Sequence, residues 1–154
     1  MSGRLWLEPG DELLLDGVDY RVIERLMART PRLSVQRLSL RPQLGGEDRA
    51  LLQFEETLME AEALPPDLLE GEQVQFGERT FHLRWEDQAH VERDRYGAAA
   101  KFGRGRFRWY TATDVAVAAL ISNADMQSAI LGTPLASGRI DLRFTEGLRR
   151  TSRG

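Results

Sequence analysis

The sequence predicts an all-β protein made of two related β-hairpin and meander units. Most of its apolar segments alternate hydrophobic and polar residues, and a period of two is typical of a half-buried strand. In addition, one pattern of glycines and apolar residues occurs twice along the 154 residues. Two such units must bury their apolar faces against each other, so we expect a sandwich or partly open barrels, with room for one or two short helices.

The first predicted element is a β-hairpin over residues 10–22. Leu13 and Leu15 alternate with their neighbours on its first arm, and the second arm repeats this spacing up to Val22. Asp16-Gly17 lies between the arms and supplies the turn, because glycine adopts a positive φ without a steric penalty from Cβ.

Three further segments complete the first unit. Residues 35–40 alternate until Arg41-Pro42 breaks the pattern, and residues 51–54 form a short strand. Residues 57–63 fit either a strand or a helix, since glutamate and alanine are good helix formers. Pro65-Pro66-Asp67 ends this segment in either state and marks the boundary between the two units.

The pattern of the first hairpin recurs 61 positions later without a gap. The matched positions are Leu7, Gly10, Leu13, Leu15, Tyr20 and Val22 in the first unit and Leu68, Gly71, Val74, Phe76, Phe81 and Leu83 in the second. Apolar residues at identical offsets predict an internal duplication. The alternative interpretation is that any two hairpins with short turns resemble each other.

The second unit contains three more alternating segments. Residues 107–111 are rich in aromatic side chains, which favours a strand. Residues 115–131 favour two strands because valine and isoleucine suit a sheet, although Asp114 and Asp125 are also suitable N-caps for two short helices. Residues 140–144 alternate once more.

These elements define the expected domain organisation. Residues 1–64 form the first β unit, residues 65–67 a Pro-Pro linker, and residues 68–146 the second β unit. The polar residues 147–154 are expected to be a disordered tail.

The composition excludes several classes of protein. The chain has no cysteine, which rules out disulfides, thiolate nucleophiles and zinc–cysteine sites. Residues 1–7 lack the long apolar run of a signal peptide, and no segment approaches the ~18 apolar residues of a membrane span. We therefore expect a cytoplasmic protein that does not insert into a membrane.

Charge is distributed unevenly along the chain. The net charge is −3, but residues 47–72 contain nine acids and one base, a local sum of −8. Residues 92–108 contain six bases and two acids, a local sum of +4. Opposite patches of this kind favour an interaction with a protein partner or with a second copy of the chain.

The basic-aromatic segment 101–110 is the most distinctive candidate site. Alternation on a strand places Arg104, Arg106 and Arg108 on one face and Phe107 and Trp109 on the other. We expect the arginines to pair with the acidic segment 55–62 of this chain or of a neighbouring molecule. The candidate binding residues are Arg104, Arg106, Arg108 and Trp109, together with Glu55, Glu56, Glu60 and Glu62.

The residues that usually carry out catalysis are not organised in any recognisable motif. There is no Gly-x-Ser-x-Gly elbow, and Gly103-Arg104-Gly105 lacks the lysine and hydroxyl residue of a phosphate-binding loop. His82, Glu86 and His90 would share one face of a helix, but the alternation around Phe81 predicts a strand with the histidine toward solvent. We expect neither a metal nor a cofactor.

The order of these segments resembles an uncharacterised bacterial domain family. The resemblance lies in a Gly-Asp-x-Leu-x-Leu-x-Gly-x-x-Tyr-x-Val hairpin at residues 10–22, an acidic strand pair around residues 51–61, the Phe81-x-Leu83 strand, the aromatic strand 107–110 and a strand leading to Gly132. Members of that domain-of-unknown-function group are often encoded beside phage-shock-protein-A-like membrane-stress genes. The family has no assigned reaction, so the resemblance implies a mostly-β accessory protein of a bacterial stress or membrane-associated system.

Together these observations predict a non-enzymatic protein-binding or scaffold module. The alternative is a β-barrel that binds single-stranded nucleic acid through residues 101–110, with arginines on phosphates and aromatic rings against bases. An enzyme that uses the carboxylates or the two histidines has the least support, because no acid–base–nucleophile set is apparent.

Overall fold

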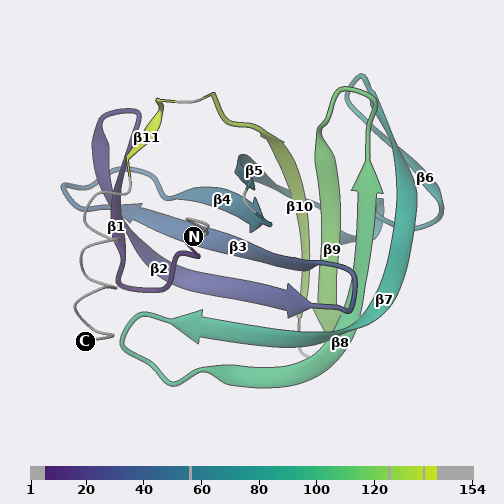
Figure 1. The fold of residues 1–154 in the computed structure, drawn as a ribbon, viewed down its shortest axis with the longest axis horizontal. Coiled ribbons are helices and arrows are strands. Elements are labelled where there is room, and N and C mark those ends of the chain that lie inside the picture. Colours follow the sequence, from purple (N-terminus) through teal and green to yellow (C-terminus); the bar gives the residue numbers. More distant parts are fainter. Residues whose placement is uncertain (1–5, 56, 125, 137, 142–154) are drawn as a thin grey trace.

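The computed structural model of the chain describes residues 6–55, 57–124, 126–136 and 138–141, and it is all-β, as predicted (Figure 1). Its strands are β1 (Glu12–Leu15), β2 (Val18–Arg29), β3 (Ser34–Pro42), β4 (Arg49–Phe54), β5 (Thr57–Leu64), β6 (Gln73–Phe76), β7 (Arg79–Arg95), β8 (Lys101–Thr111), β9 (Val117–Asn123), β10 (Gln127–Pro134) and β11 (Ile140–Asp141). Residues 57–63 are therefore strand, and residues 115–131 contain two strands. The one helical turn in the described ranges is the 3-10 turn η1 (Pro66–Leu68), at the expected linker.

Eight of these strands close into an antiparallel barrel. Their order is β2-β3-β4-β5-β10-β9-β8-β7, and the pairing of β7 with β2 closes the barrel. Both β2 and β7 are long enough to pair with two different strands along one edge. The first part of β2 pairs with β1, and its residues 24–29 pair with residues 90–95 of β7. Figure 1 shows β7 curving along the barrel, with β6 beside its first part and β2 beside its last.

Both units contribute to this one barrel. Strands β2–β5 form one meander and β7–β10 form the other, and the meanders meet at β2–β7 and at β5–β10. Closure satisfies the backbone groups that an open sheet would leave unpaired at its edges. The expected tail at residues 147–154 lies outside the described residues.

Several structural details recur at the 61-residue offset. Strand β6 begins 61 residues after β1, and each unit has a register shift at the matched place, between Val22 and Glu24 and between Leu83 and Trp85. The Val22 amide donates to the Asp11 carbonyl at 2.9 Å, and the Leu83 amide donates to the Glu72 carbonyl at 2.8 Å. An internal duplication would preserve these matched details. The duplication itself stays a prediction.

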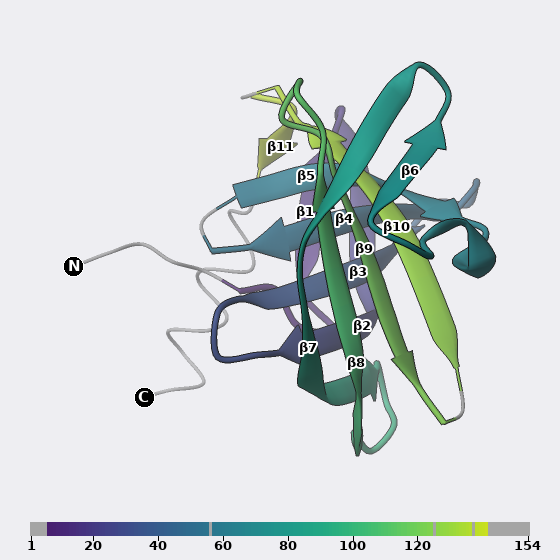
Figure 2. The same cartoon turned by 90° about the vertical axis from the view of Figure 1, so that its right-hand side faces the viewer.

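Apolar side chains fill the barrel and also cover two parts of its outer surface. The interior is filled from all eight strands by residues that include Leu26, Val35, Leu52, Met59, Val91, Phe107, Trp109, Ala119, Ile121 and Ile130. On the outside, β1 and the start of β2 cover β3 and β4 through Leu13, Tyr20, Leu40 and Leu51. On the other side, β6 and the start of β7 lie over β8, β9 and β10 (Figure 2), through Val74, Phe81, Tyr110 and Leu120.

The described part of the chain contains no helix with the length and hydropathy needed to cross a bilayer.

Candidate functional site

The arginines of β8 lie on the outer face of the barrel, as the alternation predicts. Arg104 and Arg106 are exposed and Arg108 is half-buried, whereas Phe107 and Trp109 are buried. Consecutive residues of a strand point to opposite faces, so the same alternation that fills the barrel presents the guanidinium groups outside.

Trp109 belongs to the barrel interior, so it is not positioned to contact a partner together with the arginines. Its side chain is 4% exposed. Its ring centroid lies 4.9 Å from that of Phe54 in an edge-on arrangement and 6.2 Å from that of Trp85 in a stacked one. This packing contradicts the prediction that Trp109 is a binding residue.

Among the described residues, the predicted pairing between the arginines of β8 and residues 55–62 does not form. Strands β9 and β10 lie between β8 and β5, so the two segments are not neighbours. Glu60 instead pairs with Arg139 at 3.3 Å and with Arg49. Glu55 lies in the turn before β5 with a φ of 53°, Glu62 is exposed on β5, and Glu56 lies outside the described residues.

Glu86 of β7 is the carboxylate that the β8 arginines contact instead. Arg106 donates to Glu86, and the Arg108 Nε lies 3.9 Å from the same carboxylate. Arg108 also donates to the carbonyl of Gly71 at 3.1 Å. Arg104 has no ion pair or hydrogen bond from its side chain within the described ranges, so its charge remains available.

An exposed aromatic pair lies on the same face as Arg104. Phe102 is 64% exposed, and its ring centroid lies 5.8 Å from that of His90 on β7. Strand pairing places His90 directly opposite Arg104. We name the set Phe102, Arg104, Arg106 and His90 the β7–β8 face. Phe102 is not among the predicted binding residues, although its alternation with Arg104 and Arg106 in the sequence places it on the same face.

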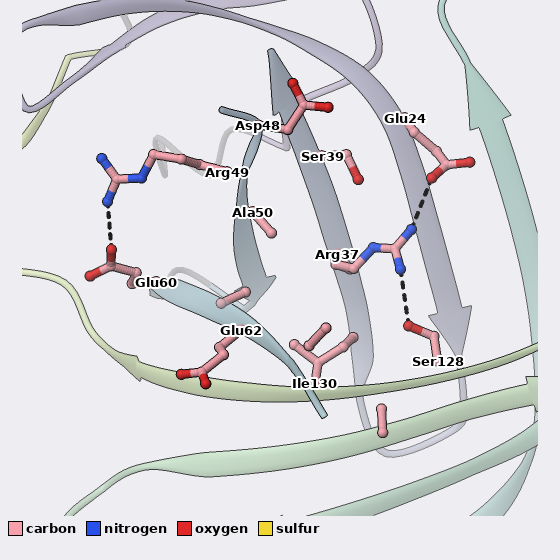
Figure 3. Close-up of a pocket in the computed structure, with 13 residues that line it drawn as sticks. Glu24, Arg37, Ser39, Asp48, Arg49, Ala50, Glu60, Glu62, Ser128 and Ile130 are labelled. Atoms are coloured by element: carbon pink, nitrogen blue, oxygen red, sulfur yellow. Dashed lines mark hydrogen bonds and ion pairs between the residues drawn. The ribbon is translucent and has the colours of Figure 1, made fainter. Parts of the chain in front are cut away.

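A second polar site lies inside one end of the barrel (Figure 3). Glu24, on β2, accepts hydrogen bonds from three arginines of β3 and β7: Arg37 at 3.0 Å, Arg93 at 2.8 Å and Arg95 at 3.1 Å. Arg37 also donates to the hydroxyl of Ser128 on β10 at 3.0 Å. These residues lie far apart in the sequence, so no local motif pointed to the cluster.

Burial and neighbouring charges shift the pKa values of Glu24 and Arg37. Burial alone would raise the pKa of Glu24, but the hydrogen bonds from Arg93 and Arg95 and the charges of Arg93 and Arg37 together lower it below its ordinary value. Burial and the nearby charge of Arg93 lower the pKa of Arg37, and Glu24 opposes them in part. Arg37, Arg93 and Arg95 share the one carboxylate of Glu24, so this cluster carries more positive than negative charge.

The two histidines are not arranged for metal binding within the described part of the chain. His82 and His90 lie on one extended strand, where eight residues span about 26 Å at ~3.3 Å per residue, so the helical arrangement with Glu86 does not arise. No group of three or more histidine and carboxylate side chains among the described residues is placed to hold a metal ion.

Comparisons of the chain with protein-family models, with curated proteins and with solved structures find no match.

Proposed function

We propose that the protein is a non-enzymatic binding module that takes an acidic protein segment on the β7–β8 face. The observation that carries this proposal is the juxtaposition of Phe102, 64% exposed, with Arg104, whose side chain has no partner in the described ranges. Aromatic residues and arginines are enriched at protein interfaces and dominate their binding energy.

The partner is expected to be a protein with an acidic surface or a second copy of this chain. The local charge of −8 over residues 47–72 provides such a surface, and Glu55 and Glu62 are exposed on it. The resemblance described above supplies the proposed setting, which is the bacterial cytoplasm and a stress or membrane-associated system. Charge complementarity of this kind guides orientation and association rate more than it adds affinity.

Size-exclusion chromatography with light scattering, at low and high salt, tests self-association, and a pull-down from the native host tests a heterologous partner. Phe102→Ala removes the exposed ring, and we expect it to weaken binding about thirtyfold, as for a hot-spot residue worth about 2 kcal/mol. Leu44→Ala is the matched control, because Leu44 is 97% exposed in the loop between β3 and β4. A monomer at every salt concentration, with no captured partner that depends on Phe102, would refute the proposal.

The second candidate function is binding of single-stranded nucleic acid, and one observation favours it. The Phe102 and His90 rings lie on the same face as the exposed Arg104 and Arg106, which is the arrangement that lets bases stack while arginines contact phosphates. Phe107 and Trp109 lie on the face opposite the arginines and cannot stack on bases beside them, whereas Phe102 lies on the same face as the arginines.

Fluorescence anisotropy with labelled single strands at about 50 mM salt separates the two functions. Under the nucleic-acid hypothesis Phe102→Ala weakens binding about tenfold, because stacking on one aromatic ring is worth about 1–3 kcal/mol. Leu44→Ala again serves as the control. Absence of binding at low salt would eliminate this candidate and leave the protein-binding proposal standing.

A further inference from the structure

The open end of the barrel contains an open cavity of about 540 Å³, and Glu24 and Arg37 form part of its wall. Small side chains make this space, because Ser39, Ala50, Ala61, Ala63 and Ser128 line it where larger residues would fill the barrel. A second hollow of about 500 Å³ shares Glu24, Ser39 and Asp48 in its wall and reaches Arg95. Ligand pockets in proteins are typically about 300–1,000 Å³.

The opposite end of the barrel is closed by aromatic packing. Phe54, Trp85 and Phe107 each contact Trp109 there, and Leu33 packs against the same interior cluster. The cavity therefore opens at the end of the barrel that holds the Glu24 cluster.

We propose that this end of the barrel is a binding site for a small organic anion, whose carboxylate or phosphate group is held by Arg37, which lines the cavity, and by Arg95, which lines the adjoining hollow. These two arginines and Arg93 share the single carboxylate of Glu24. A guanidinium group presents a planar fork of donors that matches a carboxylate or a phosphate. An anionic ligand would supply the negative charge that Glu24 alone does not.

The hydrogen bonds of Arg37 hold its guanidinium group in place inside the barrel. One of its terminal nitrogens donates to Glu24 and the other to Ser128, and both dashed contacts are visible in Figure 3. Its Nε is buried and has no hydrogen-bond partner. The two hydrogen bonds already orient the Arg37 side chain, so little conformational entropy is lost when a ligand binds.

The acids at the rim do not cancel this positive charge, because two of them have arginines of their own. Asp48 pairs with Arg41 at 3.2 Å, and Glu60 pairs with Arg139 at 3.3 Å. The carboxylate of Glu62 points away from Arg37 in Figure 3. The rest of the wall includes Ala61, Ala63 and Ile130, which suit a short aliphatic body attached to the anionic group.

Isothermal titration of the full chain with aliphatic monocarboxylates from acetate to hexanoate tests the proposal at about 50 mM salt. Affinity is expected to rise about fourfold with each added methylene until the cavity is filled. Hexyl phosphate in a parallel titration distinguishes a phosphate ligand from a carboxylate one. Hexylammonium is the control of opposite charge, and its binding in preference to both anions would overturn the proposal, as would no binding of either anion.

Two variants assign any binding to this site. Arg95→Gln, at a side chain that is 62% exposed, removes one charged donor and is expected to weaken binding about tenfold. Glu24→Gln removes the competing carboxylate and is expected to tighten binding, which a merely structural role of Glu24 would not do. An unchanged affinity in Arg95→Gln would refute the site even if Glu24→Gln failed to fold.

Arg104→Gln is the matched control, because Arg104 lies on the outer face of the barrel. If the anion site is inside the barrel, this substitution leaves anion binding unchanged. The same variant probes the β7–β8 face, so a failure of the anion site and a failure of the proposed protein-binding function give different results. Loss of anion binding in Arg104→Gln to the same extent as in Arg95→Gln would show nonspecific attraction and overturn the proposal.

Discussion

Replacing Trp109 with alanine tests whether its ring belongs to the barrel core or to a binding surface. The ring is 4% exposed and contacts Phe54 edge-on at a centroid distance of 4.9 Å. Truncating a buried tryptophan costs about 3–5 kcal/mol, and the edge-on pair accounts for about 0.5–1.5 kcal/mol of coupling. With a urea m-value of about 2 kcal/mol/M, a loss of about 4 kcal/mol lowers the unfolding midpoint by about 2 M.

Urea unfolding followed by far-ultraviolet circular dichroism measures this loss without depending on the fluorescence of the deleted residue. Phe102→Ala is the matched control, and we expect it to change the free energy of unfolding by no more than about 0.5 kcal/mol because Phe102 is exposed. A double-mutant cycle with Phe54→Leu isolates the ring pair. A loss below about 1 kcal/mol in Trp109→Ala, accompanied by weaker partner binding, would show that Trp109 belongs to a binding surface and not to the barrel interior.

Three further predictions concern the barrel wall and its polar groups. Gly105→Ala should destabilise the fold by about 1–3 kcal/mol because the added Cβ would collide with the backbone carbonyl of Ser122, whereas Gly103→Ala has space and should be nearly neutral in thermal melts. The pKa of Glu24 is lowered in the folded state, so its charge stabilises the fold fully above the ordinary glutamate pKa of about 4.3. This stabilisation is lost as the pH falls through the lowered pKa. The difference in free energy of unfolding between the native chain and Glu24→Gln should therefore shrink over that pH range. Gln53→Leu should cost about 1–3 kcal/mol in chemical unfolding, because it removes a buried acceptor that serves two donors.

Each of these has an outcome that would contradict it. Equal melting temperatures for Gly105→Ala and Gly103→Ala would show that β8 and β9 do not approach as closely as described. A stability difference between Glu24→Gln and the native chain that is the same at every pH would mean that the Glu24 charge adds nothing to folding. If Gln53→Leu leaves stability unchanged, the buried amide contacts to Gln36 and Leu7 are not required.

Short-range patterns predicted the strands, because the alternation and the turn residues that define a strand lie close together in the sequence. The turn at Asp16-Gly17 forms where it was expected, with a φ of 53° at Asp16 and 78° at Gly17. The alternation in residues 104–109 correctly placed the arginines outside and the aromatic rings inside. Residues 117–121 were harder to interpret because all five are buried, so no polar position marks either face.

By itself the sequence determined that this chain is all-β, because alternation and turn residues are local properties of a strand and its neighbours. Only the tertiary structure decided which strands meet. Barrel closure pairs Leu26 with Arg93, and it separates the acidic β5 from the basic β8 by two strands. It also brings Arg37 and Arg95 together on the carboxylate of Glu24, which lines two adjoining hollows at one end of the barrel. Such contacts depend on how the whole sheet curves and closes, and no window of neighbouring residues carries that information.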